Sequence, residues 1–164
     1  MTSPNPQSDF VPGSRAKAGL RRLTAWLLAG TMIYFGLQKV GDPAAFLKAI
    51  HGYDSLAGLP PLLLNTIASW VPILEITGGV CLALGILRRG SALMLSLMLV
   101  GFTAAVIAQA LAIQANTGQD FCDLAFDCGC GSGIVPVCTK LLQNAFMLLA
   151  CTWIAWSPEP AARS

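Results

Sequence analysis

Four of the six cysteines lie in one short segment of the chain. The segment FCDLAFDCGCGSGIVPVC, residues 121–138, contains Cys122, Cys128, Cys130 and Cys138. Cysteines this close together, outside a reducing compartment, either brace a loop as disulfides or exchange electrons with another dithiol. Which chemistry applies depends on the compartment, and therefore on the elements that hold the segment.

The spacing of these cysteines is compatible with two disulfide roles. As purely structural residues they would form two disulfides, in any of three pairings. For exchange, Cys128-Gly129-Cys130 places two sulfur atoms one residue apart, and strained, exposed disulfides are the more readily exchanged ones. Cys122 and Cys138 would then be a second redox pair or a structural pair, so both roles can coexist.

A metal site is a third interpretation of the same segment. The pattern C-x5-C-x-C-x7-C does not divide into the two short C-x2–4-C units typical of structural zinc sites. Copper(I) accepts soft thiolate ligands but need not use all four. We therefore predict no metal site.

Glu75 is the other residue whose type and position indicate chemistry. It lies near the centre of an apolar stretch, where a charge costs at least ~2.5 kcal/mol on insertion scales. Lys39 is the candidate ion-pair partner, but Glu75 lies ~20 Å along its helix, a gap that a lysine does not cover unless the first span enters more deeply. The alternatives are a buried carboxyl that joins helices through Asn144 or Gln109, and a proton or quinone site.

Composition indicates the elements that position these residues. Charged residues make up only 11% of 164 and apolar residues 55%, far from the composition of a soluble domain. Stretches of about 20 mostly apolar residues predict membrane-spanning helices. Four such stretches occur, at about residues 20–40, 62–87, 91–114 and 137–156. We predict an all-α integral membrane four-helix bundle.

The remaining segments are short. Residues 1–19 are predicted to be a disordered cytoplasmic tail, 20–156 a single membrane domain with a Cys-rich outer loop at 115–136, and 157–164 a short cytoplasmic tail. In the loop after the first span, Asp42 suits a helix N-cap and Gly52 a helix end. Phe46 and Ile50 share one face of this short helix, which we expect to lie on the membrane surface.

Basic residues predict the orientation of the bundle. The positive-inside rule puts the side richer in Lys and Arg in the cytoplasm. That side carries Arg15, Lys17, Arg21, Arg22, Arg88, Arg89 and Arg163, whereas the other carries only Lys39, Lys48 and Lys140. Both termini are therefore predicted in the cytoplasm, and the cysteine-rich loop in the periplasm or exterior. We expect a multi-pass protein of the cell inner membrane.

Within the spans, two further features concern packing. Cys81 and Cys151 fall in the hydrocarbon region, where a cysteine behaves as a small, inert hydrophobic residue. Gly79 and Ala83, four residues apart on one helix, indicate a close contact with another helix.

Several short motifs in order resemble the DoxX-like membrane proteins, and most closely the methylamine-utilisation MauE family. The resemblance covers about residues 20–156. The matching residues are Gly36 and Lys39 (Gly-x-x-Lys), Pro72 and Glu75 (Pro-x-x-Glu), Gly85, and Cys128-Gly129-Cys130 (CGC). The chain departs from the family pattern in having Gly131-Ser132 where Phe-Gly usually follows CGC, and in the additional Cys122 and Cys138.

The resemblance implies a four-helix membrane bundle. It also implies a role, with a periplasmic thioredoxin-like partner, in maturing the disulfide-rich small subunit of methylamine dehydrogenase. Other DoxX relatives are linked to quinone-coupled sulfur oxidation or to membrane redox complexes. The resemblance therefore names a quinone as the candidate cofactor, although the sequence fixes none.

Together these observations predict a membrane component of extracytoplasmic thiol–disulfide chemistry. Cys128 and Cys130 would be the exchanging pair, and a periplasmic disulfide-rich client or thioredoxin-like protein the partner. The alternative is a DoxX-type membrane anchor or quinone-linked subunit whose loop disulfides are purely structural. The lipid bilayer is the other expected partner and nucleic acid is not, and the sequence leaves open whether the protein is an enzyme.

Overall fold

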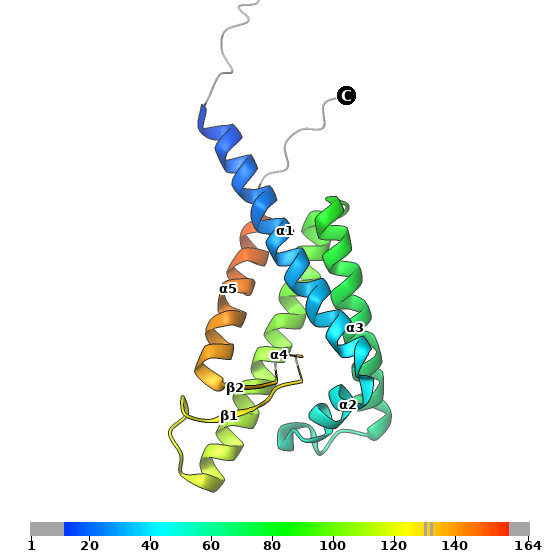
Figure 1. Ribbon diagram of the computed structural model, residues 1–164, viewed down its shortest axis with the longest axis vertical. Helices are drawn as coiled ribbons and strands as arrows, with labels where there is room; N and C mark the ends of the chain where they lie inside the picture. Colours follow the sequence, from blue (N-terminus) through cyan, green and yellow to red (C-terminus); the bar gives the residue numbers. More distant parts are fainter. Residues whose placement is uncertain (1–11, 130, 132, 158–164) are drawn as a thin grey trace, which may run out of the picture.

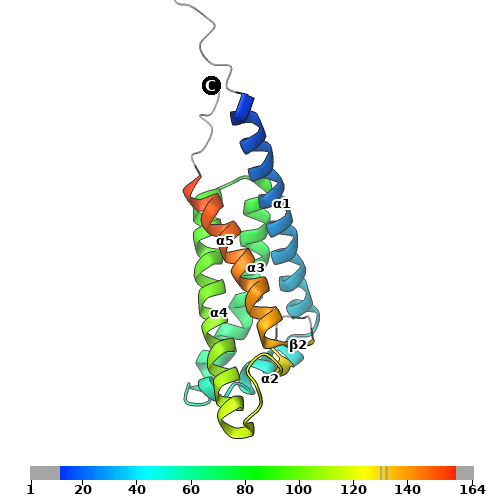
Figure 2. The ribbon, with the colours of Figure 1, turned by 90° about the vertical axis from the view of Figure 1, so that its left-hand side faces the viewer.

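The computed structural model describes residues 12–129, 131 and 133–157, and over this part the chain forms a bundle of four long helices (Figure 1). The order is α1 (Pro12–Gly41), α2 (Pro43–His51), the 3-10 turn η1 (Asp54–Leu56), α3 (Pro61–Leu84), α4 (Arg88–Thr117), β1 (Ala125–Asp127), β2 (Ile134–Pro136) and α5 (Val137–Trp156). The long helices lie side by side, while α2 and the hairpin β1–β2 lie together at one end (Figures 1 and 2). The predicted all-α class is confirmed, with the small hairpin as an addition.

The outside of the bundle is apolar, as a lipid environment requires. Large hydrophobic side chains such as Leu62, Leu97 and Leu149 are 79%, 75% and 65% exposed. In the part of the chain that the structure describes, three helices are long and apolar enough to cross a membrane: α3, α4 and α5. The chain is thus a multi-pass membrane protein, and three of the four predicted spans are confirmed in length and composition. On α1, Leu23, Trp26 and Leu27 are also exposed.

Several helix boundaries differ from the predicted ones. α1 begins at Pro12, so residues 12–19, expected to be part of an irregular tail, are helical. α3 ends at Leu84 rather than at residue 87, because Gly85 takes a left-handed φ of 74° and Leu87 one of 49°. These two residues make the tight turn into α4. The remaining residues of the two predicted terminal tails, 1–11 and 158–164, lie outside the described residues.

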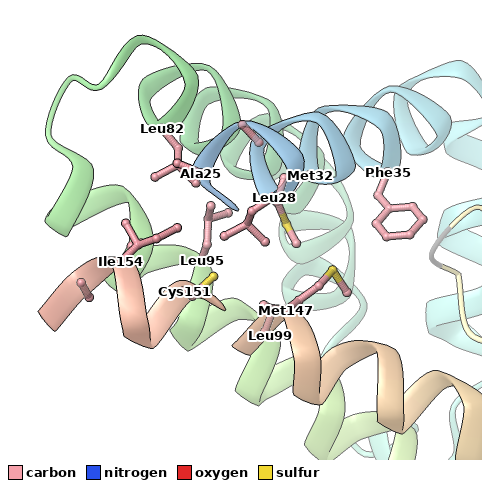
Figure 3. Close-up of a cluster of buried hydrophobic side chains, with 13 residues drawn as sticks. Ala25, Leu28, Met32, Phe35, Leu82, Leu95, Leu99, Met147, Cys151 and Ile154 are labelled. Carbon is pink, nitrogen blue, oxygen red and sulfur yellow. The ribbon is translucent and has the colours of Figure 1, made fainter. Parts of the chain in front are cut away.

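One face of each long helix contributes to the main hydrophobic core (Figure 3). Leu82 of α3, Leu95 of α4 and Cys151 of α5 are almost completely buried. Cys151 is therefore a packing residue, as predicted, while Cys81 is half-buried. Gly79 contacts α1 closely, since a Cβ atom there would lie 2.8 Å from Ile33 Cγ1 and 3.0 Å from the Ala29 carbonyl oxygen.

The short helix α2 forms as predicted but buries its apolar face in a different place. The Asp42 side chain caps it by accepting from the Ala45 N–H at 2.9 Å. Phe46 and Ile50 pack against Leu64 of α3 rather than into lipid. The expectation of a helix lying on the membrane surface was wrong about this face, because the beginning of α3 offers it an apolar partner within the protein.

Candidate functional site: a cavity beside the cysteine loop

Gly36 brings α1 and α3 into close contact in the half of the bundle nearer α2. A Cβ atom at Gly36 would lie 2.6 Å from Ile76 Cγ1 and 3.1 Å from the Pro72 carbonyl oxygen. A glycine there lets the two backbones approach more closely than any other residue would permit. One helical turn later on α1, Lys39 reaches the face of α3 that carries Glu75.

Lys39 and Glu75 form a buried ion pair. Lys39 Nζ donates to both carboxylate oxygens of Glu75, at 2.6 and 2.7 Å, and the two side chains are only 3% and 13% exposed. The Lys39 ammonium also lies 5.4 Å from the centre of the Phe46 ring, within cation–π distance. This pair places two opposite charges in the wall of the bundle.

A Lys39–Glu75 pair was expected only if the first span enters more deeply, and the structure meets this condition. The predicted gap assumed that the helix ends are level, whereas α2 and η1 extend beyond the end of α1 before α3 begins (Figure 1). The end of α1 therefore lies beside the middle of α3. The other predicted partners of Glu75 bond elsewhere: Gln109 accepts from the Asp54 N–H at 2.7 Å, and Asn144 donates to Thr103 Oγ1 at 3.1 Å.

A second lysine is also buried in the bundle. Lys140 of α5 is 2% exposed, and its ammonium lies 4.9 Å from the Phe35 ring centre and 5.9 Å from that of Phe102. Among the described residues its only hydrogen bond is a long one, 3.4 Å to Gln143 Oε1, and no carboxylate pairs with it. The distribution of basic residues in the sequence identifies Lys140 only as a charge on the predicted outer side. Its position inside a predicted span was the signal that it has a role in the bundle.

These polar groups surround a cavity of about 350 Å³ between the helices. Its wall is mostly apolar, and Lys39, Glu75, Lys140 and Asn144 are its charged and amide groups. The apolar part includes Met32, Phe35, Leu99 and Met147, which Figure 3 shows at one end of the core, together with Phe46 and Phe102. The volume is in the range of pockets that hold small organic ligands.

The cysteine-rich loop lies at the end of the bundle that holds α2, and its Cys128 lines this cavity. β1 and β2 form an antiparallel hairpin with Phe126 opposite Val135, and Cys122 and Cys138 are joined by a disulfide with a Cα–Cα distance of 5.0 Å. Their pairing, which the sequence left open, fastens the beginning of the loop to the first turn of α5. Cys130 and Ser132 lie outside the described residues.

Cys128 is separate from that disulfide and lines the cavity. It is 3% exposed, packs against Val106, and its carbonyl oxygen accepts from the Tyr53 hydroxyl at 3.2 Å. The following residue, Gly129, has a φ of 70°, and its N–H donates to Asp127 Oδ1 at 2.9 Å. Sequence reasoning gave no role to Tyr53, whose position in a short loop carries no distinctive pattern.

At Gly129 the conformation and the surroundings both require a glycine. Its left-handed φ disfavours other residues, and a Cβ atom there would lie 3.1 Å from Ala49 Cβ and 3.2 Å from the Phe46 ring. The backbone at Gly129 therefore lies directly on α2. This contact holds Cys128 at the cavity wall.

The arrangement places the Cys128 side chain at the wall of a mostly apolar cavity. Among the described residues, His, Cys, Asp and Glu form no group of three that could hold a metal ion.

Comparison with known proteins places the chain in a family. The model of the family described as "Methylamine utilisation protein MauE" matches residues 17–157, which include all four long helices from Lys17 onward and the cysteine loop. The comparisons with curated proteins and with solved structures gave no match. The chain therefore belongs to the MauE family of methylamine utilisation proteins.

Proposed function

We propose that this protein is the membrane component of a thiol–disulfide exchange system on the outer side of the cell inner membrane. In this proposal Cys128 and Cys130 are the exchanging pair, and the Cys122–Cys138 disulfide braces the loop that carries them. The client is a periplasmic thioredoxin-like protein or a disulfide-rich protein such as an amine dehydrogenase subunit. Membership of the MauE family supports a client linked to methylamine utilisation.

The observation that carries this proposal is the position of Cys128. A cysteine that only stapled the loop would need no special environment, yet Cys128 lies against the cavity and is held by Tyr53 and by the backbone at Gly129. The bracing role is already filled by the Cys122–Cys138 disulfide. The two pairs can therefore have different redox properties.

The exchange is balanced without a metal. A thiolate of the client attacks one sulfur of the Cys128–Cys130 disulfide and forms a mixed disulfide, and the other sulfur leaves as a thiolate. A second client thiolate then attacks the mixed disulfide, which leaves the client oxidised and the pair reduced. Two electrons pass from client to pair, and the reverse sequence would reduce a client.

This chemistry needs the loop to face the periplasm. We propose that α1 is the fourth span, that both termini are cytoplasmic, and that residues 20–156 form one membrane domain. The apolar residues exposed on α1, among them Leu23 and Trp26, support this placement. So does the concentration of basic residues at the opposite end of the bundle from the cysteine loop.

Redox titration of the purified protein tests the proposal. The protein is equilibrated across a glutathione series, alkylated, and analysed by mass spectrometry. We expect a disulfide that contains Cys128 to be reduced at a potential above about −300 mV, and the Cys122–Cys138 disulfide to stay oxidised there. A Cys128→Ser variant should lose exchange with a model dithiol, whereas the matched variant Cys151→Ser in the core should keep it.

The competing role is that of an anchor with purely structural disulfides. In that case Cys128 would be as resistant to reduction as Cys122 and Cys138, or would form no disulfide at all. Either result would exclude the proposed exchange.

A further inference from the structure

Two buried polar groups of the cavity wall lack an adequate partner among the described residues. Lys140 Nζ has no carboxylate partner and only the 3.4 Å contact with Gln143. Asn144 Oδ1 is buried with no hydrogen bond, although the Asn144 amide nitrogen donates to Thr103. The two residues are four apart on α5, so they lie one above the other on the same face of the helix. Both line the cavity.

Unpartnered polar groups of this kind are costly inside a membrane protein. An ammonium or an amide oxygen removed from water without a hydrogen bond is strongly disfavoured, so buried polar groups are nearly always paired. Lys39 shows the usual solution in this bundle, since its charge is met by Glu75. A hydrogen-bond partner for Lys140 and Asn144 must therefore be a molecule bound in the cavity.

The chemistry of that group follows from the two atoms. Lys140 donates a hydrogen bond and needs an acceptor, whereas Asn144 Oδ1 accepts one and needs a donor. A carboxylate would satisfy Lys140 but leave Asn144 Oδ1 unmet. A ring oxygen that is a carbonyl in one redox state and a hydroxyl in the other can meet both needs.

The apolar part of the wall favours a ring on an apolar chain. The ring centres of Phe35 and Phe102 lie 4.9 and 5.9 Å from the Lys140 ammonium, and Phe46 adds a third ring to the lining. Flat aromatic faces suit a planar head group. The surface of the bundle around the cavity is apolar, so a ligand with an apolar chain could enter from the lipid.

We propose that the cavity binds the head group of a lipid-soluble quinone, with Lys140 and Asn144 as its polar contacts. The redox role of this quinone rests on the proposed function. A cysteine pair that oxidises clients becomes reduced, and it must be reoxidised before it can act again. A bound quinone supplies that oxidation: it takes up two electrons and two protons and becomes a hydroquinone, as the dithiol closes to a disulfide. Cys128 lies on the wall of the same cavity.

Equilibrium binding of decylubiquinone to the purified protein in detergent tests the site. We expect saturable binding of one molecule per chain to the parent. Lys140→Met should weaken it at least about tenfold, the effect expected for loss of a hydrogen bond from a charged donor. The matched variant Lys48→Met removes an exposed lysine of α2 and should bind like the parent.

A second pair of variants covers the case in which Lys140→Met does not fold. Ala105→Leu adds bulk at the cavity wall and leaves every charge in place, whereas Ala104→Leu makes the same change on the exposed side of α4. Binding should be lost in the first and kept in the second. Both are to be compared with the parent by size-exclusion chromatography before binding is measured.

The outcomes separate this inference from the proposed function. If decylubiquinone does not bind, or binds equally to the parent, Lys140→Met and Ala105→Leu, the quinone site is wrong, whatever the cysteines do. Preferential binding of palmitate, lost in Lys140→Met, would also overturn it in favour of a fatty-acid site. If quinone binds as expected but Cys128 fails the redox titration, the site stands and the exchange function falls.

Discussion

The Lys39–Glu75 pair holds two opposite charges together where water is scarce. A buried pair of this kind contributes little net stability compared with apolar residues of similar size, but removal of one partner leaves the other charge unmet. Each of the two charges is therefore tolerated in the bundle only while the other is present. Its effect is best measured by changing the residues singly and jointly.

We predict that Glu75→Leu lowers the free energy of unfolding by about 3–5 kcal/mol, because the Lys39 ammonium is left without a carboxylate. The double variant Lys39→Met/Glu75→Leu should recover most of that loss. The measurement is an unfolding titration with SDS in mixed micelles, performed as a double-mutant cycle. Additive effects of the two changes would show that the two side chains do not interact.

The Tyr53 hydroxyl donates to the backbone of Cys128, which allows a conservative test of how this cysteine is held. Tyr53→Phe removes the hydroxyl that donates to the Cys128 carbonyl and keeps the ring that packs edge-on against Phe126 at 6.1 Å. We predict a loss of about 0.5–1.5 kcal/mol in stability. Hydrogen exchange should also become faster in the loop around Gly129.

The matched control for Tyr53→Phe is Tyr34→Phe, which removes a hydroxyl from a side chain that is 54% exposed. It should change neither stability nor loop exchange. Equal effects of the two variants would mean that the hydroxyl of Tyr53 does not position Cys128.

At the scale of elements, the contact of α1 with α3 decides whether Lys39 can reach Glu75. Gly36→Ala would place a methyl group 2.6 Å from Ile76 and 3.1 Å from the Pro72 carbonyl oxygen, so the helices must move apart. We predict a loss of about 1–3 kcal/mol in the free energy of unfolding, as for other overpacked positions. The unfolding titration in mixed micelles measures this loss.

Gly30→Ala is the control on the same helix, because a Cβ atom there meets nothing within 4 Å. Alanine favours a helix over glycine by roughly 1 kcal/mol, so this change should be neutral or stabilising. A Gly36→Ala protein as stable as Gly30→Ala would contradict the close crossing.

For the whole molecule, the proposed topology fixes which ends of the helices are accessible from outside the cell. A membrane-impermeant maleimide applied to intact spheroplasts should label Gln119→Cys, at the end of α4, without lysis. It should label Ala16→Cys and Gly90→Cys only after lysis, since these lie at the other end of the bundle. All three positions are exposed in the structure.

Labelling of the parent protein is measured first and subtracted as the background, since Cys128 and Cys151 are buried and Cys122 and Cys138 are bonded, while Cys81 is half-buried. Labelling of Ala16→Cys from outside, together with protection of Gly90→Cys, would mean that α1 does not cross the membrane. Labelling of Gly90→Cys from outside would reverse the orientation and remove the proposed redox compartment.

The sequence by itself determined the class of this protein. Uncharged stretches of 20 residues and more can only be helices in lipid, because lipid offers the backbone no hydrogen bonds. The capping of α2 by Asp42 was likewise readable, since short-range chemistry sets it. The motifs also led to the MauE family, which the family comparison confirmed.

Only the tertiary structure decided which distant residues meet. Lys39 finds Glu75 because α2 and η1 shift the beginning of α3 outward, a relation between helix ends that hydropathy does not encode. The Cys122–Cys138 pairing and the turn of Lys140 toward Phe35 likewise follow from how α5 docks on its neighbours. The cavity exists for the same reason. It is the space left where side chains of separate helices fail to fill their shared interior, and no single stretch of sequence specifies that space.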